Sequence, residues 1–234
     1  AALMALGMLE HTGVRDLGPD DPAALHLQIE AIKLAFADLH AYVADRPAMT
    51  GVTPADLLDP GYLAERARRI DIDRAQHHGP GAPRNGGTVY LTAADASGMM
   101  VSFIQSNYAG FGSGVVVPDT GISLQNRGWS FSLDPAHPNS LAPGKRTYHT
   151  IIPGFITRQG KAVGPFGVMG GFMQPQGHVQ LVTGMLEDHL NPQAALDMPR
   201  WKWTQGRTVE VEPHFPDHLA LALARRGHDI VKVT

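Results

Sequence analysis

A run rich in glycine and proline divides this chain into two parts that follow different hydrophobic periodicities. The run is Gly79–Gly87, and it contains four glycines and two prolines. Proline has no backbone N–H to donate, and glycine loses more conformational entropy than other residues when it is fixed in regular structure. Neither a helix nor a strand is therefore expected there. Before the run, apolar residues recur at helical spacing, and after it they recur at strand spacing. The sequence therefore predicts a breaker-rich linker over residues 76–87 between a helical part and a mainly β part.

The first part, residues 1–75, is predicted to be helical. Asp21 followed by Pro22 is typical of a helix start, because proline suits the first helical turn. Apolar residues then recur at helical spacing, at Leu25, Ile29, Ile32, Phe36 and Val43. Asp59 and Pro60 predict a second, short helix that carries Arg66, Arg68 and Arg69. We expect this arginine-rich face to be solvated.

The second part is predicted to contain paired strands followed by short helices. Strands are expected at residues 88–95, 99–106, 150–157, 162–168, 209–211 and 229–233. Helices are expected at residues 177–190, 192–198 and 216–226. Ala96, Ser97 and Gly98 form a hairpin-turn signal between the first two strands. This order of elements predicts an α+β fold, with antiparallel sheets covered by helical layers.

The composition excludes several kinds of site. The 234 residues carry a net charge of −3, which argues against a nucleic-acid-binding surface, and no apolar run reaches the roughly 18–20 residues that span a bilayer. There are no cysteines, which removes disulfides, thiolate zinc sites and cysteine nucleophiles. The twelve histidines are scattered and form no His-Glu-x-x-His pattern, so neither a metal nor another cofactor is predicted. The first residues already resemble the inside of a helix, and we expect a fragment of a longer protein.

Thr88 stands at the first position of the strand-like part, directly after Gly86 and Gly87. If the Gly87–Thr88 bond breaks, Thr88 carries both a hydroxyl nucleophile and its own base, the free α-amine. A threonine after glycine at a strand start is common, so this local pattern alone leaves an ordinary structural role open.

Three glycine-rich segments follow Thr88, at residues 110–114, 121–128 and 167–171. The first lacks the lysine and helix start of a phosphate-binding loop. In the third, Gly170 and Gly171 lie between a predicted strand and a predicted helix. Adjacent glycines there could direct backbone N–H groups toward a developing oxyanion, although a plain strand–helix turn explains the pattern equally well.

Taken together, these segments resemble one family in their order and spacing. The matching positions are Thr88–Asp95, Gly98, Val101, Ser102, Phe111–Gly114, Gly121, Ile122, Asn126, Pro143–Arg146, Pro153, Gly170 and Gly171. Upstream, Leu25–Asp45 is similar to the end of the family's large subunit. The family is that of the γ-glutamyltranspeptidases, which are N-terminal-nucleophile hydrolases, and the resemblance covers nearly the whole chain.

The resemblance implies a fold, a processing step and a reaction. The family's fold is a four-layer αββα sandwich of antiparallel sheets, here incomplete at both ends. Cleavage before Thr88 would divide the chain into a large-subunit segment, residues 1–87, and a small-subunit segment, residues 88–234, which together form one αββα domain. The reaction is amide hydrolysis or acyl transfer from a γ-glutamyl or related amide to water or an amine. No cofactor, nucleic acid or membrane is implied.

The resemblance also implies roles for particular residues. Thr88 matches the nucleophile, Ser106 the second hydroxyl that supports it, and Gly170 and Gly171 the oxyanion hole. Substrate-binding positions of the family correspond to Tyr108, Asn126, Arg127, Ser130, His149 and Thr150.

Departures from the family's pattern bear on the substrate. The stretch that holds the donor's amino group reads Gln125-Asn-Arg-Gly-Trp-Ser130 here, without an acidic residue. An arginine repels an ammonium and attracts a carboxylate. His149 and Thr150 replace a serine pair. Two other readings therefore stay open: an acylase for a non-glutamyl, glutaryl-like side chain, and a non-catalytic relative that acts as a binding module.

Overall fold

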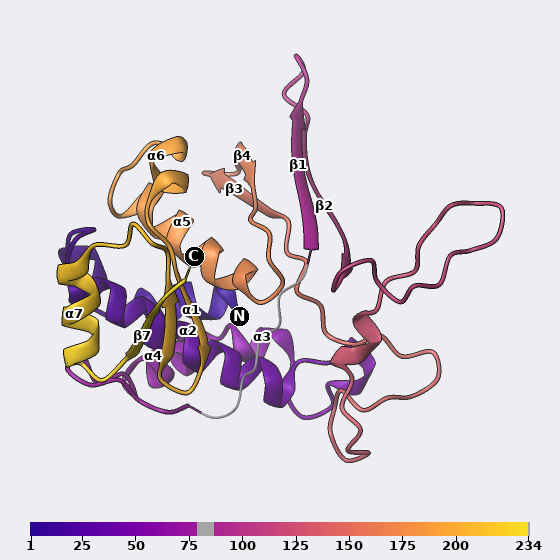
Figure 1. The fold of residues 1–234 in the computed structure, drawn as a ribbon, viewed down its shortest axis with the longest axis horizontal. Helices are drawn as coiled ribbons and strands as arrows, with labels where there is room; N and C mark the ends of the chain where they lie inside the picture. Colours follow the sequence, from indigo (N-terminus) through magenta and orange to yellow (C-terminus); the bar gives the residue numbers. More distant parts are fainter. Residues whose placement is uncertain (79–86, 234) are drawn as a thin grey trace. The chain divides into compact units, whose positions relative to one another are not determined.

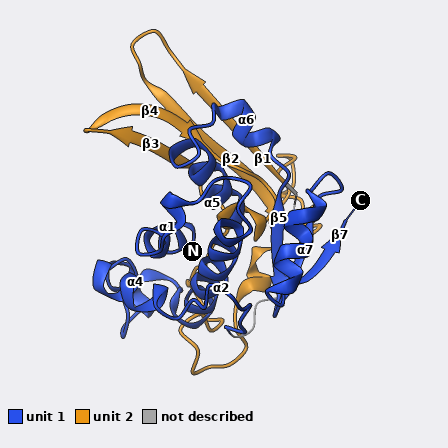
Figure 2. Ribbon diagram, turned by 90° about the vertical axis from the view of Figure 1, so that its left-hand side faces the viewer, with its two compact units in different colours: residues 1–82, 176–234 blue, residues 83–175 orange. Residues whose placement is uncertain are grey.

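The computed structural model describes residues 1–78 and 87–233. These residues form two compact units, which Figure 2 shows in blue and orange. Unit 1 comprises residues 1–82 and 176–234, and unit 2 comprises residues 83–175. In the chain, unit 2 is thus inserted between the two segments of unit 1. Residues 79–86, which form most of the predicted linker, lie outside the described residues.

The first segment of unit 1 is helical, as predicted. Its elements are α1 (Ala2–Leu9), η1 (Val14–Asp16), α2 (Pro22–Tyr42), η2 (Arg46–Ala48), α3 (Pro54–Leu57) and α4 (Pro60–Ala67). The predicted start of α2 is confirmed, because the Asp21 carboxylate accepts a hydrogen bond from the Ala23 N–H at 2.8 Å. Asp59 caps α4 in the same way. Both helices begin with proline, whose missing N–H costs nothing at that position.

Helix α2 forms the centre of unit 1 (Figure 2). Its apolar residues Ile29, Ile32 and Phe36 are fully buried, and α1, α7 and β5 pack against it. One prediction about its neighbour α4 is wrong: Arg66 does not face solvent. Its guanidinium forms a paired contact with the Asp38 carboxylate of α2, at 2.7 and 3.0 Å. Arg66 therefore joins two helices by charge-assisted hydrogen bonds.

The second segment of unit 1 contains most of α5 (Met173–Leu186), then α6 (Pro192–Asp197), β5 (Trp201–Gln205), β6 (Thr208–Val211), α7 (Asp217–Arg225) and β7 (Asp229–Lys232). The three strands form one sheet in the order β5-β6-β7. Strands β6 and β7 pair in parallel, so the prediction of purely antiparallel sheets is wrong for this sheet. The reason is the helix between them, since a crossover returns the chain to the same end of the sheet.

Strand β5 was not predicted from the sequence, although its residues alternate as a strand with one covered face does. Trp201 and Trp203 are almost fully buried, and they alternate with Lys202, which pairs with Glu210 of β6. This alternation is the period of a strand with one covered face. Helix α5 also begins earlier than expected, at Met173, because Pro175 falls in the first turn, where a helix tolerates it.

Unit 2 contains two hairpins joined by long loops (Figure 1). The first pairs β1 (Gly87–Ala94) with β2 (Met100–Tyr108), and the second pairs β3 (Gly154–Arg158) with β4 (Lys161–Phe166). The predicted turn of the first hairpin is confirmed, because the Asp95 carboxylate accepts hydrogen bonds from the N–H groups of Ser97 and Met99. β3 begins four residues later than expected.

Between the hairpins, the chain is mostly loop, with a short 3-10 helix, η3 (Arg127–Ser130). Gly112 adopts a left-handed backbone with φ of 79°, and a Cβ there would lie 2.4 Å from the Leu124 carbonyl oxygen. The glycine-rich segment at residues 110–114 therefore serves a close backbone approach. In the described parts of the chain, no helix combines the length and the apolar character that crossing a membrane requires.

Candidate active site

Thr88 and Ser106 face each other across the first hairpin of unit 2. Thr88 is the second residue of β1, and Ser106 lies near the end of β2. The register of the two strands shifts between Gly87 and Val89, so Thr88 lies at an irregular point of the ladder. The Thr88 hydroxyl donates a hydrogen bond to the Ser106 hydroxyl, with an Oγ1–Oγ distance of 3.2 Å. The two hydroxyls that the sequence singled out are therefore brought together.

Tyr108 completes this contact from the end of β2. Its backbone N–H donates to Ser106 Oγ at 2.9 Å, and its φ is 76°. Such a left-handed backbone is uncommon outside glycine and costs free energy, on the order of 1–3 kcal/mol. The side chain of Tyr108 is buried. Ser106 Oγ thus accepts hydrogen bonds from both Thr88 and Tyr108.

Arg127 packs over the ring of Tyr108, with its guanidinium carbon 4.7 Å from the ring centroid. Its Nη1 donates to Thr150 Oγ1 at 2.8 Å, while its buried Nε has no hydrogen-bond partner among residues 1–78 and 87–233. Only 2% of the Arg127 surface is exposed, and burial lowers its pKa, which the nearby Tyr108 and Tyr148 partly offset. Within the described residues, Arg127 forms no ion pair with a carboxylate.

Asn126, the neighbour of Arg127, binds the backbone of Ala109 on both sides. Its Oδ1 accepts from the Ala109 N–H, and its Nδ2 donates to the Ala109 carbonyl, each at 3.0 Å. Its own N–H donates to the Asn107 carbonyl at 3.1 Å. Asn126 therefore supports the backbone at the end of β2, and its substrate-binding role stays a prediction.

Ser130 and His149 lie further along the same unit. Ser130 interacts with the Tyr148 hydroxyl, and its carbonyl accepts from Asn139 Nδ2 at 2.7 Å. His149 Nδ1 accepts from the Ile151 N–H at 3.1 Å. Burial, assisted by the charge of Arg127, lowers the pKa of His149 to about 4. His149 is therefore neutral near pH 7.

Gly170 and Gly171 precede α5, and both have positive φ, of 110° and 60°. The segment that leads to them begins against β1, because a Cβ at Gly167 would lie 2.6 Å from the ring of Tyr90. Consecutive N–H groups in such backbone turns can face an anion. The side chain of Gln174, which follows, is fully buried, and no described residue forms a hydrogen bond with it.

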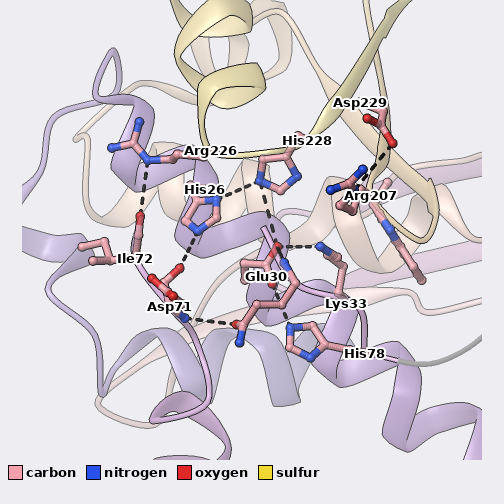
Figure 3. A network of polar contacts seen from close by, with 12 residues as sticks. His26, Glu30, Lys33, Asp71, Ile72, His78, Arg207, Arg226, His228 and Asp229 are labelled. Atoms are coloured by element: carbon pink, nitrogen blue, oxygen red, sulfur yellow. Dashed lines mark hydrogen bonds and ion pairs between the residues drawn. The ribbon is translucent and has the colours of Figure 1, made fainter. Parts of the chain in front are cut away.

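Unit 1 contains a second buried polar group of side chains, which Figure 3 shows from close by. We call it the α2 cluster, and its members are His26, Glu30, Lys33, His78 and His228. Glu30 accepts from Lys33 Nζ at 2.6 Å and contacts His78 Nε2 at 2.8 Å. Burial alone would raise the pKa of Glu30, yet His78 and Lys33 together hold that pKa below its usual value.

The two inner histidines of the α2 cluster have assignable tautomers. His26 Nε2 lies 2.8 Å from the Asp71 carbonyl oxygen, which can only accept, so this nitrogen carries a proton. Burial lowers the pKa of His26, and that of His228 falls to about 3 through burial and the charge of Lys33. Neutral His26 therefore accepts at Nδ1 from His228 Nε2, at 2.8 Å. His228 Nδ1 is buried and has no hydrogen-bond partner in the described parts of the chain.

The α2 cluster also contains atoms of the kind that bind metal ions. In the described ranges, suitable atoms of His26, Glu30 and His228 lie within 4.8 Å of one another. These atoms are already engaged, because the two imidazoles bond each other and Lys33 bonds Glu30. A divalent ion would add charge beside a buried ammonium, which is unfavourable. The chemistry of the cluster is therefore that of a charge-matched network, and we assign no metal to it.

Comparison with known proteins places the whole chain in one family. A profile of the gamma-glutamyltranspeptidase family matches residues 1–234. The chain belongs to the gamma-glutamyltranspeptidase family. It is 38% identical over 233 residues to the glutathione hydrolase-like YwrD proenzyme of Bacillus subtilis, covering 97% of this chain and 43% of that relative. It is 39% identical over 234 residues to the oxamate amidohydrolase proenzyme of Klebsiella pneumoniae, covering 98% and 44%.

A solved structure shows the same relation in three dimensions. The crystal structure of cephalosporin acylase from Bacillus halodurans superposes with a TM-score of 0.89 at 55% identity, covering 100% of this chain and 42% of that one. The chain therefore spans somewhat under half the length of these gamma-glutamyltranspeptidase-family relatives. The α+β class predicted from sequence is confirmed by this match.

The contacts of unit 2 join some of the predicted site residues and not others. Thr88, Ser106, Tyr108, Arg127 and Thr150 form a continuous series of contacts. Ser130 and His149 make contacts outside this series. The α2 cluster was not predicted from the sequence, although His26, Glu30 and Lys33 form a polar stripe at positions i, i+4 and i+7 of a largely apolar helix.

Proposed function

We propose that this chain is part of a self-cleaving amide hydrolase or acyltransferase in which Thr88 is the nucleophile. The observation that carries the proposal is the hydrogen bond between the Thr88 and Ser106 hydroxyls at the irregular start of β1. Membership in a family whose relatives include proenzymes supports it.

In the first step, Thr88 Oγ attacks the carbonyl carbon of Gly87. The peptide C–N bond breaks as the ester C–O bond forms, and the hydroxyl proton passes to the nitrogen, which becomes the free α-amine of Thr88. Water then hydrolyses the ester, restores the hydroxyl and leaves a carboxylate on Gly87. The products are the large-subunit and small-subunit segments, residues 1–87 and 88–234, held together in one αββα sandwich that further parts of the protein would complete.

In turnover, the α-amine of Thr88 acts as the base for its own hydroxyl. An α-amine has an ordinary pKa of about 7.7–8.0, so it needs little adjustment near neutral pH. Thr88 takes the acyl group of the substrate as an ester, and the leaving amine gains a proton. Water or a second amine then accepts the acyl group. The Gly170 and Gly171 amides would hold the oxyanion, and losing one such donor costs about 10²–10³ in rate.

The proposal is tested by intact mass spectrometry of the purified full-length protein. We expect two fragments, the smaller beginning at Thr88. Thr88→Ala should remain one uncut chain without amidase activity, whereas Thr88→Ser, which keeps a hydroxyl, should still be cut. Cleavage of Thr88→Ala at the same bond would overturn the proposal. An uncut, stable wild-type chain would favour a non-catalytic relative that acts as a binding module.

A second candidate is an acylase for a non-glutamyl side chain, such as a glutaryl-like amide. The buried guanidinium of Arg127, which lacks a carboxylate partner among the described residues, favours it. An arginine suits an anionic acyl group better than a γ-glutamyl ammonium. Two relatives bear names of enzymes that act on other amides. They are the oxamate amidohydrolase of Klebsiella pneumoniae and the cephalosporin acylase of Bacillus halodurans.

Two anilides separate the two candidates. A γ-glutamyl anilide carries an ammonium group that a glutaryl anilide lacks, while both release the same chromophore. A higher kcat/KM for the γ-glutamyl compound would favour the transpeptidase reading. A higher kcat/KM for the glutaryl compound would favour the acylase.

A further inference from the structure

The end of strand β2 holds a strained residue directly beside the proposed nucleophile. Tyr108 has a φ of 76° and is buried, whereas a non-glycine residue normally avoids this backbone region. Backbone strain of this kind persists only where surrounding contacts fix it. Neighbouring residues must therefore hold the backbone of Tyr108 in this conformation.

The backbone of Tyr108 provides a hydrogen bond to Ser106. Its N–H donates to Ser106 Oγ at 2.9 Å. The same oxygen accepts from Thr88 Oγ1 at 3.2 Å. A serine hydroxyl has two lone pairs, so these two donors fix the direction of the Ser106 oxygen. The orientation of Thr88 thus depends on the backbone at Tyr108.

Two consecutive residues at the start of η3, its N-cap Asn126 and its first residue Arg127, hold this backbone in place. Asn126 makes two hydrogen bonds to the backbone of Ala109, as a neighbouring strand would. Arg127 covers the ring of Tyr108 at 4.7 Å. Arg127 is itself fixed, because its Nη1 bonds Thr150 and its N–H donates to the Gln125 side chain. A cation over a ring in a desolvated setting is a favourable contact that can offset backbone strain.

We propose that Arg127 is a positioning residue for Thr88. It holds the ring of Tyr108, which keeps the Tyr108 N–H on Ser106, and Ser106 in turn orients the Thr88 hydroxyl. The inference rests on the proposed function of Thr88 as nucleophile. It assigns Arg127 a role in self-cleavage, a step in which no external substrate takes part.

Because self-cleavage needs no external substrate, it distinguishes a positioning role of Arg127 from a role in substrate binding. If Arg127 only binds an anionic acyl group, its replacement changes KM for such substrates and leaves self-cleavage untouched. If Arg127 positions Thr88, its replacement slows self-cleavage itself. A misplacement of a reacting group by about 1 Å costs on the order of 100-fold in rate.

The experiment follows the conversion of newly synthesised full-length precursor into two fragments, by intact mass against time. We expect Arg127→Met to slow this first-order step by roughly 10–100-fold. Arg158→Met is the matched control, because it removes an exposed arginine of the same unit that lies outside this series of contacts, and it should be cut at the wild-type rate. Thr150→Val, which removes the acceptor of Nη1 at nearly constant volume, should slow cleavage by a smaller factor and covers the case in which Arg127→Met fails to fold.

A double-mutant cycle tests the route of the effect. If Arg127 acts through the ring of Tyr108, then Tyr108→Ala combined with Arg127→Met is no slower than the slower single variant. Multiplying rate losses would overturn the proposal, as would cleavage of Arg127→Met and Thr150→Val at the wild-type rate. A wild-type protein that is never cut at Gly87–Thr88 would contradict the proposed function and this inference together. This outcome differs from the two above, in which the wild type is still cut.

Discussion

Each of the two units buries a cation, but the groups that surround the charge differ between them. In unit 1, Lys33 is fully buried, and Glu30 accepts its hydrogen bond at 2.6 Å while His78 contacts the other carboxylate oxygen. In unit 2, Arg127 is equally buried, but within the described residues its side chain contacts a hydroxyl and a tyrosine ring, and its Nε has no hydrogen-bond partner. Each cation loses its hydration, yet in the part of the chain that the structure describes only Lys33 has a carboxylate beside it.

This difference separates a buried charge that is matched by a carboxylate from one that is not. Desolvating an ion costs several kcal/mol unless an opposite charge and good hydrogen bonds offset it. The α2 cluster meets that condition within unit 1, so its charges contribute to folding. Arg127 does not, and the resulting unfavourable free energy is the kind that proteins carry at functional sites. Four measurements test this comparison.

The largest effect is expected at Lys33. Lys33→Met removes the ammonium and leaves the buried Glu30 carboxylate with His78 Nε2 at 2.8 Å, the Gln76 N–H at 3.5 Å and His228 Nε2 at 4.0 Å. We expect the free energy of unfolding to fall by about 3–5 kcal/mol, because breaking a buried pair leaves an uncompensated charge. Urea unfolding followed by circular dichroism measures the loss. A loss below about 1 kcal/mol would mean that the α2 cluster is not the stabilising network described above.

Acid should weaken the protein through His228. Its pKa is about 3 in the folded state, against an ordinary value of about 6.5, so the unfolded state binds the proton between these pH values. Stability therefore falls as pH drops from 6.5 toward 3, by up to about 1.4 kcal/mol per pH unit from this residue. His26, which is also shifted down, adds to the slope, while Glu30, Lys33 and Arg226 face the pair.

The matched variant for this acid effect is His228→Asn, which cannot titrate. Between pH 6 and pH 4, its stability should fall less steeply than that of the wild type. An unchanged slope would show that His228 is protonated in the folded protein. The quantity to compare is the change in the free energy of unfolding with pH, and not its absolute value.

A small effect on stability is expected at Arg127. Arg127→Met gives up the bond to Thr150 and the contact with Tyr108, but it also removes a desolvated charge without a counter-ion. We expect the free energy of unfolding to change by less than about 1 kcal/mol, in contrast to Lys33→Met. The same urea titration applies. A loss as large as that at Lys33 would indicate that the charge of Arg127 is matched after all.

The smallest effect is expected at the surface pair of Arg200 and Glu212. Its side chains are 52% and 37% exposed, although the contact is short, at 2.7 Å. Exposed pairs contribute about 0.2–1 kcal/mol because water and salt screen them. Arg200→Gln should therefore lie within about 1 kcal/mol of the wild type, and the loss should shrink further in 1 M salt.

Local sequence signals predicted many of the elements and several of the site residues. The caps at Asp21 and Asp59, the turn at Asp95 and the pairing of β1 with β2 all depend on neighbours in sequence. The contact of Thr88 with Ser106 also lies within one hairpin. These features were predictable because period, capping and turn chemistry are local.

Features that depend on distant residues were not predictable in the same way. The parallel pairing of β6 with β7 depends on how the α7 crossover packs, and the strand at Trp201 depends on burial by helices from elsewhere in unit 1. Arg66 was expected in solvent because its partner, Asp38, lies 28 positions earlier. The pairing of His26 with His228 left no local pattern in the sequence.

That last pairing bears on the order in which the protein is made. His26 and His228 lie 202 positions apart, and all of unit 2 is synthesised between them. Helix α2 therefore leaves the ribosome with a charged stripe whose last partner does not yet exist. At about 5–20 residues per second, this interval lasts roughly 10–40 seconds. During that time all of unit 2 is synthesised, and closure of the first unit is a late event in the life of the nascent chain.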